Sequence, residues 1–210
     1  MRQDLTEIIL IVDRSGSMSA CQEDAEGGIN TFIEEQKKGV GEANLTLVQF
    51  DTRYDFVYKG TPIGDVTPYR LRPAGMTALL DAVGRAISET GERLAAMTEA
   101  DRPATVICVI VTDGKENASR EYTLQQVKAM IEEQRDKYSW HFNFLGANAD
   151  VFDQATNIGI RAPCVVQYNL CKPGAAYRKM SEKVTSARKC TSTSEPVDTT
   201  YTDEDRKDLE

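Results

Sequence analysis

Short runs of aliphatic residues, each bounded by turn-forming residues, constrain the fold of this chain most strongly. Each run is five to eight residues long, which suits a strand better than a helix. An apolar run without polar alternation indicates a strand that is buried on both faces, as in a parallel sheet covered by helices. The runs lie at residues 7–12, 45–50, 105–111, 140–147 and 164–168.

The stretches between these runs carry apolar residues at helical spacing. Alternating strands and helices predict an α/β fold, a Rossmann-like doubly wound sheet that is mostly parallel, with helices on both faces. One connection differs, because the segment 54–60 follows the run 45–50 after only three residues. This short connection predicts an antiparallel strand at one edge. The apolar helix faces are Met18, Cys21, Ala25, Ile29, Phe32 and Ile33; Leu79, Leu80, Val83, Ile87 and Leu94; and Leu124, Val127 and Ile131.

A last amphipathic helix is expected after residue 172, because four apolar residues form one stripe there. We expect the basic residues of this helix to lie largely off the stripe and to face solvent; binding of RNA or of an acidic protein is the less expected alternative. The stripe consists of Tyr177, Met180, Val184 and Ala187, and the basic residues are Arg178, Lys179, Lys183, Arg188 and Lys189.

We divide the chain into a domain of residues 1–190 and an acidic tail of residues 191–210. The tail is rich in Ser, Thr and acidic residues, a composition typical of a flexible segment. It holds seven Asp and Glu against two Lys and Arg, whereas residues 172–190 hold six Lys and Arg against one Glu. We hypothesise that the tail folds onto the basic helix, or that it offers a carboxylate to a metal of the same or a neighbouring molecule, which would allow self-association.

The composition argues against several classes of protein. A chain of 210 residues that is 40% hydrophobic suits one α/β domain. Its net charge of -8 opposes nucleic-acid binding, which requires a basic face. The N-terminal residues do not have the form of a signal peptide or membrane span, so we expect a cytoplasmic protein that does not contact membranes. No disulfide framework or zinc spacing is evident among Cys21, Cys108, Cys164, Cys171 and Cys190.

Two of the predicted strands end in an aspartate that is followed by small polar residues. Asp13 begins the motif D-R-S-G-S, which also contains Ser15 and Ser17, and Asp113 stands in T-D-G after the run 105–111. In an open α/β sheet, functional loops lie beyond the carboxyl ends of the strands, where the strand order reverses. If these two strands flank that point, Asp13 and Asp113 face each other.

Thr77 is expected to join the same edge of the sheet. After the hairpin the chain is at the opposite end of the sheet, and residues 60–76 are long enough to bring it back to this edge. The gathered side chains would then be two carboxylates and three hydroxyls, which suit Mg²⁺, Mn²⁺ or Ca²⁺ better than Zn²⁺. Because two negative charges only balance a divalent ion, the ion can accept one further oxygen, most favourably a carboxylate of another molecule.

Together these motifs resemble the metal-ion-dependent adhesion site (MIDAS) of von Willebrand factor A (VWA) domains, and the likeness extends over residues 5–190. The resemblance implies a sheet in the order 3-2-1-4-5-6 with an antiparallel third strand at the edge. It also implies that Asp13, Ser15 and Ser17 bind Mg²⁺ directly or through water. By the same resemblance Thr77 binds directly in the ligand-engaged state, and Asp113 acts mainly through water.

Residues that flank these motifs are candidates for a rim that contacts a partner. Each is either a partner contact or an exposed turn residue without a specific role, and the same holds for Asn117. Met18, in contrast, is expected in the core of the first helix. The rim candidates are Arg14, Lys115, Glu116, Asn148 and Asp150.

We expect a non-enzymatic module that binds an acidic side chain of a protein partner through a shared Mg²⁺. The resemblance implies a scaffold, in some cases beside an AAA+ ATPase, and in some relatives, including integrin-type domains, the last helix moves to change affinity. The alternative is a metal-dependent phosphatase or nuclease with Glu116 as the base. A nucleophilic triad is not expected, because the single histidine, His141, lies near the start of its strand and cannot activate Cys21.

Overall fold

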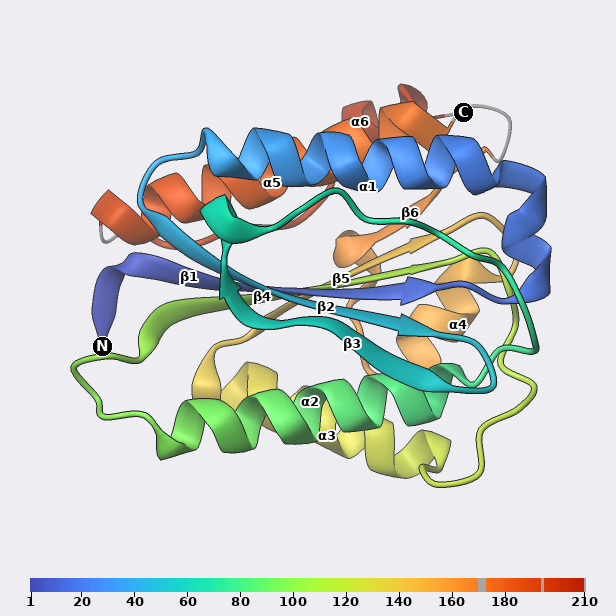
Figure 1. The fold of residues 1–210 in the computed structure, drawn as a ribbon, viewed down its shortest axis with the longest axis horizontal. Coiled ribbons are helices and arrows are strands. Elements are labelled where there is room, and N and C mark those ends of the chain that lie inside the picture. The colour runs from blue at the N-terminus through green and yellow to red at the C-terminus, as the bar shows by residue number, and fades with distance from the viewer. Residues whose placement is uncertain (170–172, 194, 210) are drawn as a thin grey trace.

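A six-stranded sheet runs through the middle of the molecule, with helices on both faces (Figure 1). The computed structural model describes residues 1–169, 173–193 and 195–209. The first strand listed below pairs antiparallel with its neighbour, and the other pairs are parallel, which confirms the predicted fold and strand order. In order across the sheet the strands are β3 (Tyr54–Pro62), β2 (Glu42–Phe50), β1 (Arg2–Asp13), β4 (Pro103–Thr112), β5 (His141–Gly146) and β6 (Val165–Gln167).

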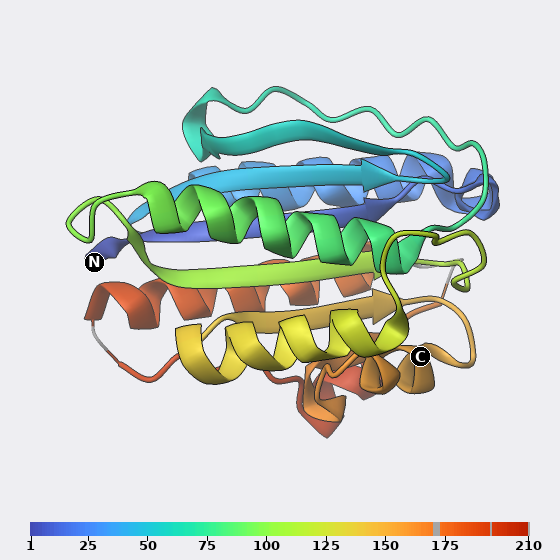
Figure 2. The same cartoon turned by 90° about the horizontal axis from the view of Figure 1, so that it is seen from below.

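The helices form two layers, one on each face of the sheet (Figures 1 and 2). Each layer closes its own apolar cluster against the sheet. One face is covered by α1 (Gln22–Lys37) and α5 (Pro173–Thr193), and the other by α2 (Leu79–Ala96), α3 (Leu124–Tyr138) and α4 (Val151–Asn157). Shorter elements are η1 (Gly16–Cys21), η2 (Ile63–Asp65), η3 (Ala162–Cys164) and α6 (Asp203–Lys207).

The central strand β1 is buried from both sides. Ile8 and Leu10 belong to the apolar cluster under α1 and α5, whereas Ile9 and Ile11 belong to the cluster under α2 and α3. All four side chains are 0% exposed, so a polar residue here would lose its water without gaining a partner. Residues 8–12 are therefore all apolar, and the first polar side chain after them is Asp13, at the carboxyl end of the strand.

An extended segment, residues 66–78, carries the chain from the hairpin back to the carboxyl ends of the strands (Figure 2). Tyr69 and Leu71 are buried. Asn30 of α1 fixes the segment, because its side-chain oxygen accepts a hydrogen bond from the Tyr69 N–H (2.7 Å) and its side-chain nitrogen donates to the Tyr69 carbonyl (3.0 Å). This path confirms that the connection is long enough to return Thr77 to the predicted edge.

Arg188 does not face solvent as expected, because it is one of the largest fully buried side chains. Its guanidinium donates to the backbone carbonyl and the side-chain oxygen of Gln36, and to the Gly41 carbonyl (3.0 Å). Gln36 in turn donates to the side chains of Ser181 (3.0 Å) and Thr185 (2.9 Å). The expectation was wrong because a guanidinium has five donors, and here they bind Gln36 of α1 and the Gly41 carbonyl just beyond that helix, which permits burial.

Residues 195–209 lie against the domain instead of extending from it. Tyr201 and Leu209 are 3% and 5% exposed, and both join the apolar cluster under α5. This packing differs from the flexible tail that the composition indicated, and it matches the hypothesis that the tail folds onto the basic helix. The helix itself continues to Thr193, so the proposed boundary at residue 190 falls inside it. The division of the chain into domain and tail stays a prediction.

The cysteines of the described segments are free thiols. They are Cys21, Cys108, Cys164 and Cys190, while Cys171 lies outside the described residues. Over residues 1–169, 173–193 and 195–209, no helix has the length and apolar character needed to cross a membrane.

Replacing Arg188 with Ala is expected to lower the free energy of unfolding by about 3 kcal/mol, because the change removes the donors that bind Gln36 and the Gly41 carbonyl and opens a cavity. Urea denaturation measures the difference. Lys189→Ala on the same helix is the control, because Lys189 is exposed and its loss should change stability by less than about 0.5 kcal/mol. Similar small effects from both substitutions would contradict the structural role of Arg188.

Candidate metal centre

The loop that follows β1 is a tight turn that contains Asp13, Ser15 and Ser17. The Ser15 N–H donates to Asp13 Oδ1 (2.6 Å), and the Ser15 and Ser17 hydroxyl oxygens lie 3.0 Å apart, within hydrogen-bond distance. The Gly16 N–H donates to the Gly75 carbonyl (3.1 Å), which joins this turn to the extended segment that carries Thr77. Asp13 and Ser15 are buried, and Ser17 is exposed at the surface of the turn.

Two side-chain hydrogen bonds join this turn to the loop that follows β4. Ser17 Oγ donates to Asp113 Oδ1 (2.7 Å), and Thr112 Oγ1 donates to Asp13 Oδ2 (2.6 Å). The bonds form because β1 and β4 are parallel neighbours in register up to their carboxyl ends. Sequence reasoning missed Thr112. The available signal was a hydroxyl residue directly before Asp113, in the strand expected beside Asp13.

Thr77 lies near Asp13, with Gly114 between the two side chains. A Cβ placed on Gly114 would lie 2.6 Å from Thr77 Oγ1 and 3.2 Å from Asp13 Oδ2. Because the shorter distance is a collision, only glycine leaves room between these two oxygens. The structure thus brings all five predicted ligand side chains to one edge of the sheet, with Gly114 between Thr77 and Asp13.

Asn117 holds the backbone of Thr77 from two sides. The Thr77 N–H donates to Asn117 Oδ1 (2.9 Å), and the Asn117 N–H donates to the Thr77 carbonyl (3.0 Å). The Ala118 N–H donates to the same carbonyl (3.2 Å). The sequence indicated either a partner contact or a turn residue without a specific role for Asn117. These hydrogen bonds make it a positioning residue for Thr77.

Both carboxylate oxygens of Glu116 are occupied within the protein. Oε1 accepts hydrogen bonds from the N–H groups of Ala118 (3.0 Å) and Ser119 (2.8 Å). Oε2 accepts from the Leu80 N–H (2.9 Å) and from Ser119 Oγ (2.7 Å). Glu116 therefore ties the loop after β4 to the first turn of α2, and its side chain is not directed to a partner or to a reacting water.

The candidate ligands carry negative charge that the protein does not neutralise. Burial raises the pKa of Asp13, and the charge of Asp113 raises it further; burial also raises the pKa of Asp113. Arg14 pairs instead with Asp51 (3.1 Å) and Asp55 (2.8 Å). No ion pair of Asp13 or Asp113 with a basic side chain occurs within the described residues. This donor set fits a divalent cation, which would supply the missing positive charge.

The other rim candidates contact the site loops or one another. Asn148 Nδ2 donates to the Gly114 carbonyl (3.2 Å), and its Oδ1 accepts from the Asp150 N–H (3.2 Å). Lys115 forms an ion pair with Asp150, and their side chains are 64% and 48% exposed. Asn148 therefore supports the loop, while Lys115 and Asp150 are accessible beside the site.

Asp51, at the end of β2, is a further aspartate of this edge that sequence reasoning missed. Its carboxylate is buried, pairs with Arg14 and accepts a hydrogen bond from the Arg53 N–H. Its carbonyl accepts from the Ala78 N–H (3.0 Å). The residue thus anchors the loop after β2 to the start of α2. The signal was present, because the run 45–50 ends in an aspartate as the run 7–12 does.

The single histidine and the nearest cysteine lack the features of a nucleophilic site. His141 is the first residue of β5, at the end of the strand far from the candidate ligands. Burial raises the pKa of Cys21 to about 11, so this thiol is protonated near neutral pH. No three His, Cys, Asp or Glu side chains of the described segments form a metal-binding group, so the candidate centre depends on its hydroxyls as well as its two carboxylates.

Comparison with protein-family models gives no match, and neither does comparison with curated proteins. Solved structures do match. Proximal thread matrix protein 1 from the mussel byssus is 16% identical with a TM-score of 0.62, and the alignment covers 88% of this chain and 48% of that chain. A structure of the same mussel protein has a zinc-occupied MIDAS motif; it is 16% identical with a TM-score of 0.58, covering 86% and 46%.

Two bacterial structures show the same likeness. A von Willebrand factor type A structure from Catenulispora acidiphila is 16% identical with a TM-score of 0.58, covering 86% of this chain and 43% of that chain. The vWF domain of the type V pili tip protein Mfa5 from Porphyromonas gingivalis is 11% identical with a TM-score of 0.60, covering 85% and 94%. This chain spans under half the length of the mussel and Catenulispora chains. At these identities the likeness establishes the fold: the chain folds as a von Willebrand factor A domain.

Proposed function

We propose that this chain is a protein-binding module that recognises an acidic residue of its partner through a divalent cation. The observation that carries the proposal is the gathering of two carboxylates and three hydroxyls, without a neutralising basic side chain, where the loops after β1 and β4 meet. A site of oxygen donors with two negative charges favours a hard divalent ion. The ion retains enough positive character to attract a carboxylate from outside.

The ion would be held by Asp13, Ser15, Ser17, Thr77 and Asp113. Mg²⁺ suits these donors, and Mn²⁺ and Ca²⁺ share its preference for oxygen. The zinc-occupied motif of the mussel protein supports Zn²⁺ as a further ion for a site of this kind, although imidazole and thiolate ligands are absent from the five candidates. When bound, the ion supplies a position for an incoming oxygen, and the hydrogen-bonded loops keep that position in place.

The proposed partner is a protein that presents an exposed Asp or Glu side chain. Lys115 and Asp150 border the site and are accessible to polar groups around that residue. Met76, next to Thr77, is 53% exposed and offers an apolar contact on the same rim. An AAA+ ATPase assembly as partner, a cytoplasmic location, and the expected lack of membrane and nucleic-acid contacts stay predictions.

A hydrolase that uses the same ion gains no support from the site. Hydrolysis needs a base placed near the metal-bound water, and the candidate base, Glu116, accepts four hydrogen bonds from its own loop and the first turn of α2. We therefore propose binding without catalysis. Phosphatase or nuclease activity with Mg²⁺ or Mn²⁺ that disappears in Asp13→Ala would contradict this choice.

Mg²⁺ is expected to raise the unfolding temperature of the native chain, because a ligand that binds only the folded state adds about 2.7 kcal/mol at about 100 times its Kd. Asp13→Asn should remove most of this shift, since it deletes one of the two charges. Thermal unfolding in MgCl₂ and in EDTA measures both. Asp65→Asn, an exposed change in η2, should keep the native shift, and an undiminished shift in Asp13→Asn would count against the site.

Asn117→Ala is expected to weaken Mg²⁺ binding by about 10-fold to 100-fold, because residues that orient metal ligands contribute on this scale. The substitution frees the backbone of Thr77 on the N–H side and leaves all five ligand side chains in place. Isothermal titration calorimetry measures the Kd. Asn157→Ala, at an exposed position of α4, is the matched control. Equal Kd values for the two variants would show that Asn117 does not position Thr77.

Capture of a partner by the immobilised native chain is expected in Mg²⁺ and not in EDTA. Thr77→Ala should lose the same partner, because it removes the hydroxyl expected to bind the ion when the ligand is engaged. Mass spectrometry of the captured proteins, followed by Asp→Asn and Glu→Gln substitutions in the identified partner, tests the acidic contact. A partner that Thr77→Ala retains in EDTA binds elsewhere and would refute the metal-bridged mode.

A further inference from the structure

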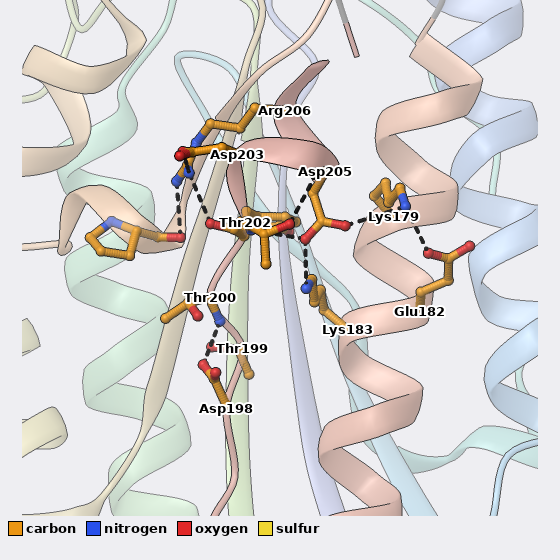
Figure 3. A network of polar contacts seen from close by, with 12 residues as sticks. Lys179, Glu182, Lys183, Asp198, Thr199, Thr200, Thr202, Asp203, Asp205 and Arg206 are labelled. Atoms are coloured by element: carbon orange, nitrogen blue, oxygen red, sulfur yellow. Dashed lines mark hydrogen bonds and ion pairs between the residues drawn. The ribbon is translucent and has the colours of Figure 1, made fainter. Parts of the chain in front are cut away.

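The surface formed by α5, η3 and β5 is covered by the tail segment, residues 195–209. Two main-chain hydrogen bonds hold the segment on η3 and β5. The Tyr201 N–H donates to the Pro163 carbonyl (2.8 Å), and Asn143 Nδ2 donates to the Thr199 carbonyl (2.7 Å). We call Asn143, Pro163, Lys179 and Lys183, with the apolar residues of α5 beside them, the tail-binding surface; Figure 3 shows the two lysines and the tail segment.

Apolar side chains anchor the tail segment to this surface. Tyr201 and Leu209 are 3% and 5% exposed, and they share an apolar cluster with Met180 and Val184 of α5. The Lys183 ammonium lies 5.8 Å from the centre of the Tyr201 ring, where a cation is attracted to the ring face. A buried aromatic residue of this kind is a typical anchor of a bound peptide.

Carboxylates of the tail segment pair with the lysines of the surface (Figure 3). Asp205 lies 2.7 Å from Lys183 and 3.3 Å from Lys179, and Asp208 lies 3.5 Å from Lys179. Although burial raises the pKa of Asp205, hydrogen bonds from Lys183 hold it well below its usual range. Because Asp205, Lys179 and Lys183 are only 13% to 23% exposed, these pairs are screened less than fully exposed ones.

The order of the tail segment depends on the surface it covers. Its single helix, α6, has five residues, which is too short to be stable by itself. Residues 195–202 have no helix or strand. The segment therefore contributes an aromatic anchor and acidic contacts to a surface made by earlier parts of the chain, as a peptide does on a separate protein.

The tail segment of the same chain occupies this surface, and we propose that the tail-binding surface also docks the tail segment of a second copy, an acidic segment that carries a tyrosine. A second copy carries the same sequence, so its tail makes the same contacts, and reciprocal exchange joins two chains. The occupant needs acidic residues that pair with Lys179 and Lys183, and an aromatic residue that packs into the apolar cluster. This site lies on the α5 face and does not depend on the proposed metal.

Reversing one charge on each side of the contact tests the exchange with full-length chains. Lys183→Glu places two acids together within its own chain, and Asp205→Lys places basic groups together within its own chain. Mixed together, each variant offers the other a complementary surface or tail. We expect dimers in the mixture by sedimentation velocity, and monomers for either variant alone. The chain with both substitutions restores the pairing within one molecule and should be monomeric.

A mixture that stays monomeric, or a double variant that dimerises as the mixture does, would overturn the proposal. Lys189→Glu replaces Lys183→Glu as the control, because it makes the same charge change at an exposed position of the same helix and should not dimerise with Asp205→Lys.

A second measurement covers the case in which Lys183→Glu fails to fold. A fluorescein-labelled peptide with the sequence of residues 195–209 is titrated with the native chain and with Asp205→Lys, and fluorescence anisotropy reports binding. The peptide should bind Asp205→Lys at least about 10-fold more tightly, because the native tail competes at high effective concentration. Raising NaCl from about 50 mM to about 500 mM should weaken this binding. Equal binding to both chains would place the peptide elsewhere and refute the docking site.

Discussion

The burial of β1 between two helical layers is the constraint on which the candidate site depends. Ile8 and Leu10 face one apolar cluster and Ile9 and Ile11 the other, so the run from Ile8 to Val12 is apolar, and the first polar side chain after it is Asp13 at the end of the strand. Because β1 lies between β2 and β4, the loops that follow three parallel strands leave the sheet side by side. The chain proceeds from β1 through β2 and β3 on one side and then crosses through α2 to β4 on the other side of β1, which makes this edge the point where the strand order reverses. Asp13 is placed at that point by the core behind it.

Hydroxyl and N–H donors bind the carboxylates of Asp13 and Asp113 and leave their negative charge without a basic partner. Thr112 and the Ser15 N–H satisfy the oxygens of Asp13, while the guanidinium of Arg14, the residue after Asp13, is held by Asp51 and Asp55. A lysine or arginine at the site would have stabilised the same loops and removed the attraction for a cation. The ligand side chains are therefore held in place by hydrogen bonds and keep their negative charge. A metal-dependent binding site requires both properties.

The basic residues of α5 illustrate how one helix face takes several roles. Arg188 is buried and satisfies carbonyls at the end of α1, Lys183 pairs with the tail segment, and Lys189 remains exposed. Helical periodicity grouped them as residues off the apolar stripe, yet each role depends on the groups that lie opposite. Backbone carbonyls accept hydrogen bonds from a guanidinium, a carboxylate attracts an ammonium, and water hydrates the remaining charge.

The sequence alone determined the strand runs, their order by resemblance, and the residues able to bind a hard ion, because apolar periodicity and oxygen-bearing side chains are local properties of the chain. Only the tertiary structure decided which polar groups meet. It placed Thr112 on Asp13, made Asn117 the support of Thr77, buried Arg188 and packed Tyr201 of the tail segment into the apolar cluster under α5. Each of these contacts joins residues far apart along the chain, and the energy of a polar group depends on the partner that faces it after folding. A pattern of residue types shows where a side chain can be buried, and it does not contain the identity of that partner.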